Sequence, residues 1–384
     1  MIVTMNEELE QIKNMVRDFV EYEVEPYAQQ IEEEDVLPQH LVDKAKELGM
    51  FGLSIPEAYG GIGLNTVGKA LVLEQLGRTH NGFVSLISAH TGIGSTGLVK
   101  LASDSLKAKY LPDMAAGRKI AAFALSEPGA GSDATNLSTK AVKKGDKWIL
   151  NGMKHFITNG PIADVFTVFA VTDKEKGAKG GITSFLVEKN FPGLIVGKTD
   201  KKMGLRGSYT SQIIFEDCEV PEENVIGEVG LGYSSALRIL GEGRVGLAAR
   251  SVGSCAKLIE MSARYAQERV QFGKPIAANQ GIQWMIAEMA TETEAARALT
   301  YQAASLIDSG KKAIKEASMA KLFATDVFNR VADKAVQIHG GMGYMAEYPV
   351  ERFYRDARIT KIYEGTNEIQ KIIISQRVFE ECAK

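Results

Sequence analysis

Residues Gln337 to Gln370 read QIHGGMGYMAEYPVERFYRDARITKIYEGTNEIQ and place a run of aromatic and charged side chains between two glycine clusters. Near its end, Gly365 follows Glu364, and glycine permits backbone angles that let another molecule approach closely. Thr366 or Asn367 suits the N-cap of a closing helix. The apolar stripe of that helix consists of Ile369, Ile372, Ile373 and Val378. Glu364 is therefore predicted to lie on a loop just before a helix, free to point into a cavity.

Two interpretations of Glu364 follow from this local pattern. A carboxylate held in a cavity by apolar and aromatic neighbours is a candidate general base. A solvated loop glutamate beside a turn glycine is the simpler alternative, and the local pattern by itself favours it. A choice between the two needs evidence from the rest of the chain.

Length and composition are those of an ordinary globular protein. The 384 residues exceed what one core usually holds and predict two or three domains. Hydrophobic residues make up 45% and charged residues 24% of the chain. The net charge of −3 gives no bulk attraction to nucleic acid or to anionic membranes, so neither is expected as a partner.

The sequence predicts a cytoplasmic protein without a metal site. No apolar run approaches the length of a membrane span, and the first residues lack the layout of a signal peptide. The three cysteines, Cys218, Cys255 and Cys382, are far apart and form neither a disulfide framework nor a zinc ligand set. The five histidines are scattered.

Residues 1–118 are predicted to form a helical domain, because apolar residues recur there at helical spacing. The expected helices cover a run from Leu9 to Val20 that Pro26 ends, then 41–48, 65–76 and 98–111. Between the last two, Ser88 to Gly97 is rich in small residues. Such a stretch indicates tight helix packing by default, but it also leaves room for a long apolar ligand.

The spacing of apolar residues changes near Lys119. Residues 119–228 are predicted to form a β domain, either a small barrel or a sandwich. The expected strands cover 120–125, 139–142, 147–150, 165–171, 182–187, 194–196 and 211–215. Lys143 to Asp146 gives a hairpin signal, and Asn151-Gly152 gives a second turn signal.

Residues 229–384 return to a helical pattern. The expected helices cover 233–268, 281–309, 364–380 and a long amphipathic segment whose apolar residues run from Ala320 to Ile338. The whole chain is thus predicted as a multi-domain α+β protein with the order helical, β, helical.

Four stretches carry candidate site chemistry. The glycine-rich loop Ser126 to Asp133 follows a strand, so its backbone N–H groups suit phosphate or ring oxygens; an ordinary connection is the alternative. Taken alone, the stretch Phe156 to Gly160 is interpreted as the end of a strand followed by a turn. Arg269 to Pro275 suits phosphate binding or an unliganded helix end. Gly341 to Ala346 matches GxGxxA, but a helix precedes it where a dinucleotide fingerprint needs a strand, which excludes a Rossmann site.

Taken together, these stretches resemble the acyl-CoA dehydrogenase family, flavoproteins that desaturate acyl-CoA thioesters. The resemblance covers essentially the whole chain. It rests on SEPGAGSDA at 126–134, FITNG at 156–160, RVQFGKPI at 269–276, QIHGGMGY at 337–344 and IYEGTNEIQ at 362–370, in the family's order and spacing. It implies an N-terminal helical domain, a central β domain, a C-terminal four-helix domain, bound FAD, a homotetramer and electron transfer to an electron-transfer flavoprotein.

The resemblance also implies roles for single residues. Glu364 matches the catalytic base, and Gly365 matches the residue against the thioester. The positions that match flavin contacts are Phe123, Leu125, Ser126, Gly131, Ser132, Phe156 and Thr158. Those that match contacts to the FAD of a neighbouring subunit are Arg269, Phe272, Gln280, Gln337, Gly340 and Gly341. Thr366 and Glu368 match positions near the adenine and pyrophosphate, although many relatives carry an amide where Glu368 stands.

Ser132 and the segment Gly241, Glu242, Gly243 and Arg244 resemble positions that touch the CoA part of the substrate. Branched-chain members with a relocated base carry a glutamate immediately before the arginine that matches Arg244, and here that residue is Gly243. Glu242 is one residue away, about 100° around a helix, and is not expected to replace it. The resemblance thus implies a straight-chain enzyme.

Residues 89–94 and 163–170 look most like long-chain relatives, which favours medium or long acyl chains. In the implied mechanism, the base takes the α proton while the β hydrogen leaves as hydride to the flavin. Donors that include the Glu364 N–H stabilise the enolate. The alternatives are an acyl-CoA oxidase, a short-chain or branched-chain dehydrogenase, and a flavin-binding paralogue without turnover.

Overall fold

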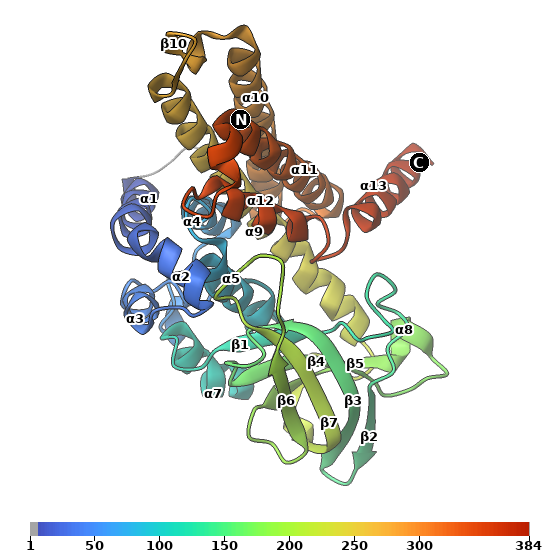
Figure 1. The fold of residues 1–384 in the computed structure, drawn as a ribbon. Coiled ribbons are helices and arrows are strands. Elements are labelled where there is room, and N and C mark those ends of the chain that lie inside the picture. The colour runs from blue at the N-terminus through green and yellow to red at the C-terminus, as the bar shows by residue number, and fades with distance from the viewer. Residues whose placement is uncertain (1–6, 384) are drawn as a thin grey trace.

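An N-terminal helical region, a sheet and a C-terminal helical region follow one another along the chain (Figure 1). The computed structural model describes residues 7–383. The expected helical, β, helical order is therefore confirmed. The first six residues, considered above for a signal peptide, lie outside the described part of the chain.

Helices of the N-terminal region begin where polar side chains cap them. Asn65 accepts a hydrogen bond from the N–H of Gly68 at the start of α4, and Ser103 accepts one from the N–H of Leu106 at the start of α7. The α-helices are α1 Glu7–Asp18, α2 Ala28–Glu34, α3 Gln39–Glu47, α4 Thr66–Leu76, α5 Asn81–Ala89, α6 Ser95–Leu101 and α7 Asp104–Ala115. Short π or 3-10 segments are η1 Phe19–Val24, η2 Glu25–Tyr27, η3 Glu57–Tyr59 and η4 His90–Gly94.

Two predicted boundaries in this region are wrong. The chain does not leave the helical conformation at Pro26 but stays helical through Glu34. Pro26 lies in the first turn of η2, where a missing N–H costs no hydrogen bond. The helix predicted over 98–111 is two helices, α6 and α7, because the side chain of Ser103 starts a new one.

The sheet has the strand order β6-β7-β3-β2-β4-β5-β8, and β1 pairs with β4 in parallel. Its strands are β1 Ala121–Ala124, β2 Lys140–Lys144, β3 Lys147–Thr158, β4 Val165–Val171, β5 Ile182–Glu188, β6 Leu194–Thr199, β7 Thr210–Pro221 and β8 Val225–Ile226, with the short helices α8 Gly177–Gly181 and η5 Glu222–Asn224 between them. The hairpin predicted at Lys143 to Asp146 joins β2 to β3.

The sheet is open, so the closed form of the predicted barrel is not present, although the β character of the region is confirmed. The turn predicted at Asn151-Gly152 is also wrong, because both residues lie inside β3. The register against β7 shifts between Leu150 and Gly152, which marks a β-bulge. Gly152 has φ +147°, and a Cβ there would lie 2.6 Å from the Cα of Thr139, so glycine serves a bulge here.

The C-terminal region is built on three long helices that pack side by side, α9 Gly232–Glu268, α10 Gln280–Asp308 and α11 Ile314–His339. Two further helices, α12 Val350–Thr360 and α13 Asn367–Cys382, pack on α11. The hairpin of β9 Val270–Gln271 and β10 Lys274–Pro275, followed by η6 Ile276–Ala278, joins α9 to α10, and η7 Gly340–Tyr344 follows α11. Helix α12 had no counterpart among the predicted helices.

The two helical regions share one core. The largest apolar cluster contains Leu76 and Phe83 from the first region together with Val252 and Val331 from the last. Helix α4 comes very close to α9, since a Cβ on Gly253 would lie 1.9 Å from the carbonyl oxygen of Glu74. This close approach brings side chains of α4 and α9 to opposite walls of the cavity described next.

Candidate active site

The loop between α12 and α13 carries Glu364 in a left-handed conformation, with φ +55°, and Gly365 follows with φ +87°. A non-glycine residue with positive φ costs about 1–3 kcal/mol and persists only where its surroundings hold it. Thr366 is the N-cap of α13, because its hydroxyl accepts a hydrogen bond from the N–H of Ile369 at 3.3 Å. The predicted loop position and cap are therefore both present.

Buried polar side chains hold this loop in place. The ammonium of Lys321, on α11, donates to the carbonyl oxygen of Gly365 at 2.9 Å and to Oδ1 of Asn367 at 2.8 Å. The side chain of Gln370 donates to the same Gly365 oxygen at 2.9 Å. Burial lowers the pKa of Lys321 to about 8. These contacts stabilise the strained backbone that aims Glu364.

The carboxylate of Glu364 is buried without a hydrogen-bond partner among the described residues at its Oε2 atom. Burial raises the pKa of Glu364 above its ordinary 4.5, since desolvation disfavours the charged form. The cations Arg250, Lys321 and Arg244, in decreasing order, oppose this shift. A carboxylate with a raised pKa and a free oxygen is suited to accept a proton.

Glu364 lines a narrow cavity of about 340 Å³, a volume that includes space open to solvent. Lys69 and Leu73 of α4 form one wall, Ser88 of α5 and Gly92 of η4 form another, and Gly243 and Arg250 of α9 form a third. Within the small-residue stretch 88–97, Gly92 lines the cavity and Gly94 lies in tight packing. A Cβ on Gly92 would meet nothing within 4 Å, whereas one on Gly94 would lie 2.8 Å from the carbonyl oxygen of Ala89.

Gly243 leaves room for the carboxylate of Glu364, because a Cβ at Gly243 would lie 2.5 Å from Oε2 of Glu364. The position before Arg244 is therefore a spatial neighbour of the base position. Glu242 also lines the cavity, but it forms an ion pair with Lys100 of α6. Arg244 is buried and donates to the hydroxyl of Ser318 at 3.3 Å, while its Nε has no partner among the described residues.

The predicted flavin loop is fixed to the sheet by a second buried carboxylate, Glu127. Its oxygens accept hydrogen bonds from the N–H and the hydroxyl of Ser138 at 2.6 Å and from the N–H of Thr139 at 3.0 Å. They also accept one from the ammonium of Lys154 at 2.7 Å, and Lys154 donates in addition to the carbonyl oxygen of Leu125. Burial alone would raise the pKa of Glu127, but Lys154 and these donors lower it to about 2.

This anchoring places the loop Ser126 to Ser132 beside the end of β3. The N–H of His155 donates to the carbonyl oxygen of Ser126 at 2.9 Å, so the two predicted flavin segments are neighbours. Phe156 has φ +59° and is 67% exposed, Thr158 is partly exposed, and a Cβ on Gly131 would meet nothing within 4 Å. An exposed aromatic ring beside a hydroxyl and open backbone N–H groups fits a planar cofactor ring. Phe123 and Leu125 lie on β1 and just after it.

The remaining predicted FAD residues lie elsewhere in the same chain. Arg269, Phe272 and Gln280 surround the β9–β10 hairpin, and Gln337, Gly340 and Gly341 lie where α11 ends. Figure 1 shows this hairpin and the sheet at opposite ends of the molecule. Phe272 is 99% exposed, and the side chain of Arg269 makes no hydrogen bond within residues 7–383. One chain therefore does not bring this group together with the flavin loop.

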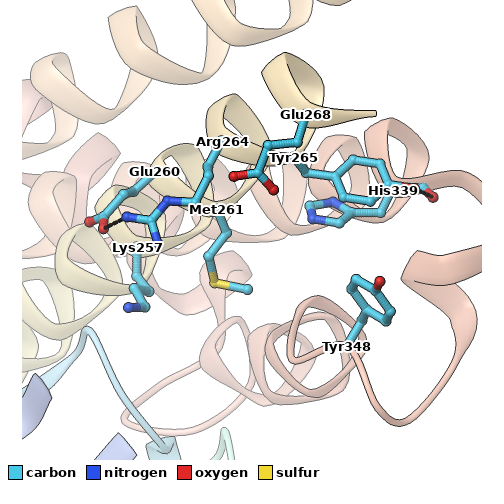
Figure 2. A pocket seen from close by; sticks show the side chains of 8 residues that line it. All are labelled: Lys257, Glu260, Met261, Arg264, Tyr265, Glu268, His339 and Tyr348. Atoms are coloured by element: carbon cyan, nitrogen blue, oxygen red, sulfur yellow. Dashed lines mark hydrogen bonds and ion pairs between the residues drawn. The ribbon is translucent and has the colours of Figure 1, made fainter. Parts of the chain in front are cut away.

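A separate hollow, shown in Figure 2, is lined by residues of α9 between Lys257 and Glu268, by His339 at the end of α11 and by Tyr348. The rings of Tyr265 and His339 stack there at 4.3 Å, with Tyr348 at 6.2 Å from each. This hollow contains neither Glu364 nor the flavin loop, so it is not the place of the candidate base.

Several site residues were missed by the sequence analysis. Lys69, Arg250 and Lys321 surround Glu364, and Lys154 pairs with Glu127. A usable signal existed for two of them, because Lys69 and Arg250 each interrupt a helical run of small and apolar residues. Within residues 7–383, no group of three metal-ligating side chains occurs, and none of the helices is long and apolar enough to cross a membrane.

Comparison with known proteins shows which family the chain belongs to. The models of the acyl-CoA dehydrogenase N-terminal, middle and C-terminal domains match residues 6–118, 122–218 and 230–379. An acyl-CoA dehydrogenase of Bacillus subtilis (strain 168) is 47% identical over 365 residues, which are 95% of this chain and 96% of the relative.

Two solved structures are also similar. One comes from work on the electron transferring flavoprotein of Acidaminococcus fermentans, with TM-score 0.96, 43% identity, and 98% of this chain and 99% of that one covered. The other is an acyl-CoA dehydrogenase complexed with FAD from Bacillus anthracis, with TM-score 0.92, 40% identity, and 99% of this chain and 68% of that one covered. The chain belongs to the acyl-CoA dehydrogenase family of FAD-dependent oxidoreductases.

Proposed function

We propose that the protein converts a saturated acyl-CoA thioester to its trans-2-enoyl-CoA, with Glu364 as the base that removes the α proton. The observation that supports this role most strongly is the buried Oε2 of Glu364, which faces Gly243 across the cavity wall and has no hydrogen-bond partner among the described residues. A carboxylate kept free in this way is available to a substrate proton.

The thioester α proton is weakly acidic, so the enolate that forms must also be stabilised. The backbone N–H of Glu364 makes no hydrogen bond within residues 7–383 and is therefore free to donate to the thioester oxygen. FAD, when bound, supplies the acceptor for the β hydride. The residues proposed to hold its ring are those of the anchored loop Ser126 to Ser132 and of the β3 end, Phe156 and Thr158. Ser132 and the segment Gly241 to Arg244 are proposed to contact CoA.

We propose a short, straight acyl chain. The sequence favours medium or long chains, but the narrow cavity and the basic groups Lys69 and Arg250 in its walls are better suited to a short one. The straight-chain assignment is supported by Gly243, because a glutamate there would occupy the space of the Glu364 carboxylate.

We propose a homotetramer in which Arg269, Phe272, Gln280, Gln337, Gly340 and Gly341 contact the FAD of a neighbouring subunit, while Thr366 and Glu368 lie near its adenine and pyrophosphate. In one chain the β9–β10 hairpin, which carries Phe272, lies at the opposite end of the molecule from the sheet, and this supports the proposal. So do large apolar side chains that are exposed near the hairpin and η7, namely Phe272, Trp284 and Tyr344. An electron-transfer flavoprotein is the proposed acceptor, supported by the similar structure from such a system.

The direct test mixes purified FAD-loaded protein with acyl-CoA thioesters under anaerobic conditions. The flavin absorbance should bleach, and the reduced protein should reoxidise quickly with an electron-transfer flavoprotein and slowly in air. Fast reoxidation in air would instead indicate an acyl-CoA oxidase. If no acyl-CoA bleaches the flavin, the protein is a flavin-binding paralogue without turnover and the proposal is wrong.

A further inference from the structure

A buried lysine without a partner lines the acyl cavity. Lys69 lies on α4, whose buried face is otherwise mostly apolar, and is 5% exposed. Within residues 7–383 its ammonium makes no hydrogen bond and no ion pair, although it lines the same cavity as Glu364. An ammonium that leaves water without a partner loses several kcal/mol of solvation, so such a group normally has a partner in the functional state.

A second buried cation lies across the cavity. Arg250 of α9 donates to the hydroxyls of Ser88, at 3.1 Å, and of Tyr363, and it pairs with no carboxylate among the described residues. Both of these partners are neutral, so no direct contact within residues 7–383 compensates the charge of Arg250. Lys69 and Arg250 come from different helices and line the same cavity. A chance arrangement of surface side chains does not explain why two buried cations meet there.

The carboxylates near this cavity do not balance these two charges. Glu242 is already paired with Lys100, and Asp308 accepts the N–H groups of Thr66 and Val67 at the start of α4. Glu364 remains as one carboxylate against two cations. Among the side chains that line the cavity, the cations therefore outnumber the unpaired carboxylates, and Arg244 and Lys321 add further positive charge near Glu364.

We propose, on the basis of the dehydrogenase function above, that the acyl group carries a carboxylate at its far end and that Lys69 pairs with this carboxylate. The substrates are then short dicarboxylic acyl-CoA thioesters. Arg250 contributes positive potential from another wall of the cavity. An alkyl chain of equal length would leave the Lys69 ammonium facing a methyl group. Burial lowers the pKa of Lys69, and the Glu242 carboxylate opposes this shift.

The test compares acyl groups of equal length with and without the terminal carboxylate. The probes are succinyl-, glutaryl- and adipyl-CoA against butyryl-, pentanoyl- and hexanoyl-CoA. The proteins are the wild type, Lys69→Met, Lys69→Arg and the control Lys107→Met, a lysine on α7 whose nearest acid is Asp104 on the same helix. FAD content and thermal stability are recorded for each protein.

For at least one pair, the wild type should show kcat/KM roughly 10- to 100-fold higher for the dicarboxylic substrate, the range expected for a charge-assisted hydrogen bond. Lys69→Met should abolish the ratio of kcat/KM between the two members of a pair, and Lys69→Arg should retain part of it. Lys107→Met should match the wild type.

The proposal is wrong if the wild type prefers the alkyl member of every pair, or if Lys69→Met lowers both members equally. Binding of the same six thioesters, measured by calorimetry, separates this result from a failure of the dehydrogenase function. It is possible to test the carboxylate site even if no thioester is oxidised. The site is still supported if the wild type binds dicarboxylic thioesters more tightly and Lys69→Met abolishes this preference. Equal binding of both classes would contradict it.

Discussion

Glu127 and Glu364 are both buried glutamates with basic residues nearby, yet their pKa values move in opposite directions. Glu127, in the loop after β1, accepts hydrogen bonds from Ser138, Thr139 and Lys154. Glu364, in the loop before α13, has an Oε2 atom without a partner among the described residues. The pKa of Glu127 is lowered to about 2, whereas burial raises that of Glu364.

The difference shows that a cation in direct contact, together with hydrogen-bond donors, compensates for the burial of Glu127, whereas the cations around Glu364 do not overcome its burial. Four donated hydrogen bonds fix Glu127 in its ionised form and make it a structural anchor for the flavin loop. The cations around Glu364 act mainly through space, so its desolvation is not compensated and its basic oxygen stays available. Substitutions at the two sites should therefore have different consequences.

The largest expected effect is on catalysis at Glu364. Glu364→Gln keeps the volume of the side chain and removes the basic oxygen, so anaerobic bleaching by a substrate should slow by about 10²- to 10⁴-fold. FAD content should stay nearly unchanged. The control is Glu242→Gln, whose carboxylate lines the same cavity but is paired with Lys100. A dead Glu242→Gln beside a normal Glu364→Gln would move the base to α9.

The next effect is on stability at Glu127. Lys154→Met removes the ion-pair partner and leaves a buried charge, which should lower the free energy of unfolding by about 3–5 kcal/mol and weaken FAD retention. Urea unfolding and flavin release measure both. Glu364→Gln should show no comparable loss, since it removes no hydrogen bond to the carboxylate. Equal destabilisation of the two variants would remove the distinction drawn here.

Acid should affect the two sites with opposite signs. The pKa of Glu127 is about 2 in the folded state against 4.5 ordinarily, so its contribution to stability is present above pH 4.5 and is lost as the pH falls towards 2. That contribution amounts to at most about 3 kcal/mol. The pKa of Glu364 is raised, so its contribution is present below pH 4.5 and is lost as the pH rises. As the pH rises, the wild type should therefore lose stability relative to Glu364→Gln in unfolding experiments. A stability difference that stays the same at every pH would contradict this expectation.

A smaller effect is expected at Gly243. Gly243→Ala places a methyl group 2.5 Å from the unmoved Oε2 of Glu364, so the carboxylate must shift, and bleaching should slow by about 10- to 100-fold. Gly281→Ala is the matched control, because a Cβ there meets nothing within 4 Å on another helix, α10. Wild-type bleaching rates in Gly243→Ala would show that the base tolerates displacement.

The sequence could predict what depends on local signals. The position of Glu364 just before a capped helix is predicted by the neighbouring Gly365 and Thr366. The strands within 119–228 are predicted by the alternation of apolar and polar residues and by the turn signals between them. Asn151-Gly152 carries the local signal of a turn. However, β3 pairs with β7 both before and after these two residues, so they form a β-bulge inside the strand. Helix α12 begins after Pro349 and has an apolar stripe that includes Val350 and Phe353, a signal that was available.

The environment of Glu364 could not be predicted in the same way. Lys69 and Arg250 are 181 positions apart and meet only because α4 packs closely on α9. The pairing of Glu127 with Lys154 likewise requires the flavin loop to fold back on β3. Resemblance to the family leads to the proposal that Glu364 is the base, but only the packed structure shows which carboxylates have donors.

The most direct test of the account is an infrared titration of protein labelled with ¹³C-glutamate. The wild type should keep a protonated glutamate carboxyl band at pH values above the ordinary 4.5, and Glu364→Gln should lack that band. The label separates this signal from Asp356, a buried aspartate whose pKa burial also raises. A wild type whose glutamates all titrate at or below 4.5, or a Glu364→Gln variant that keeps the band, would contradict the account.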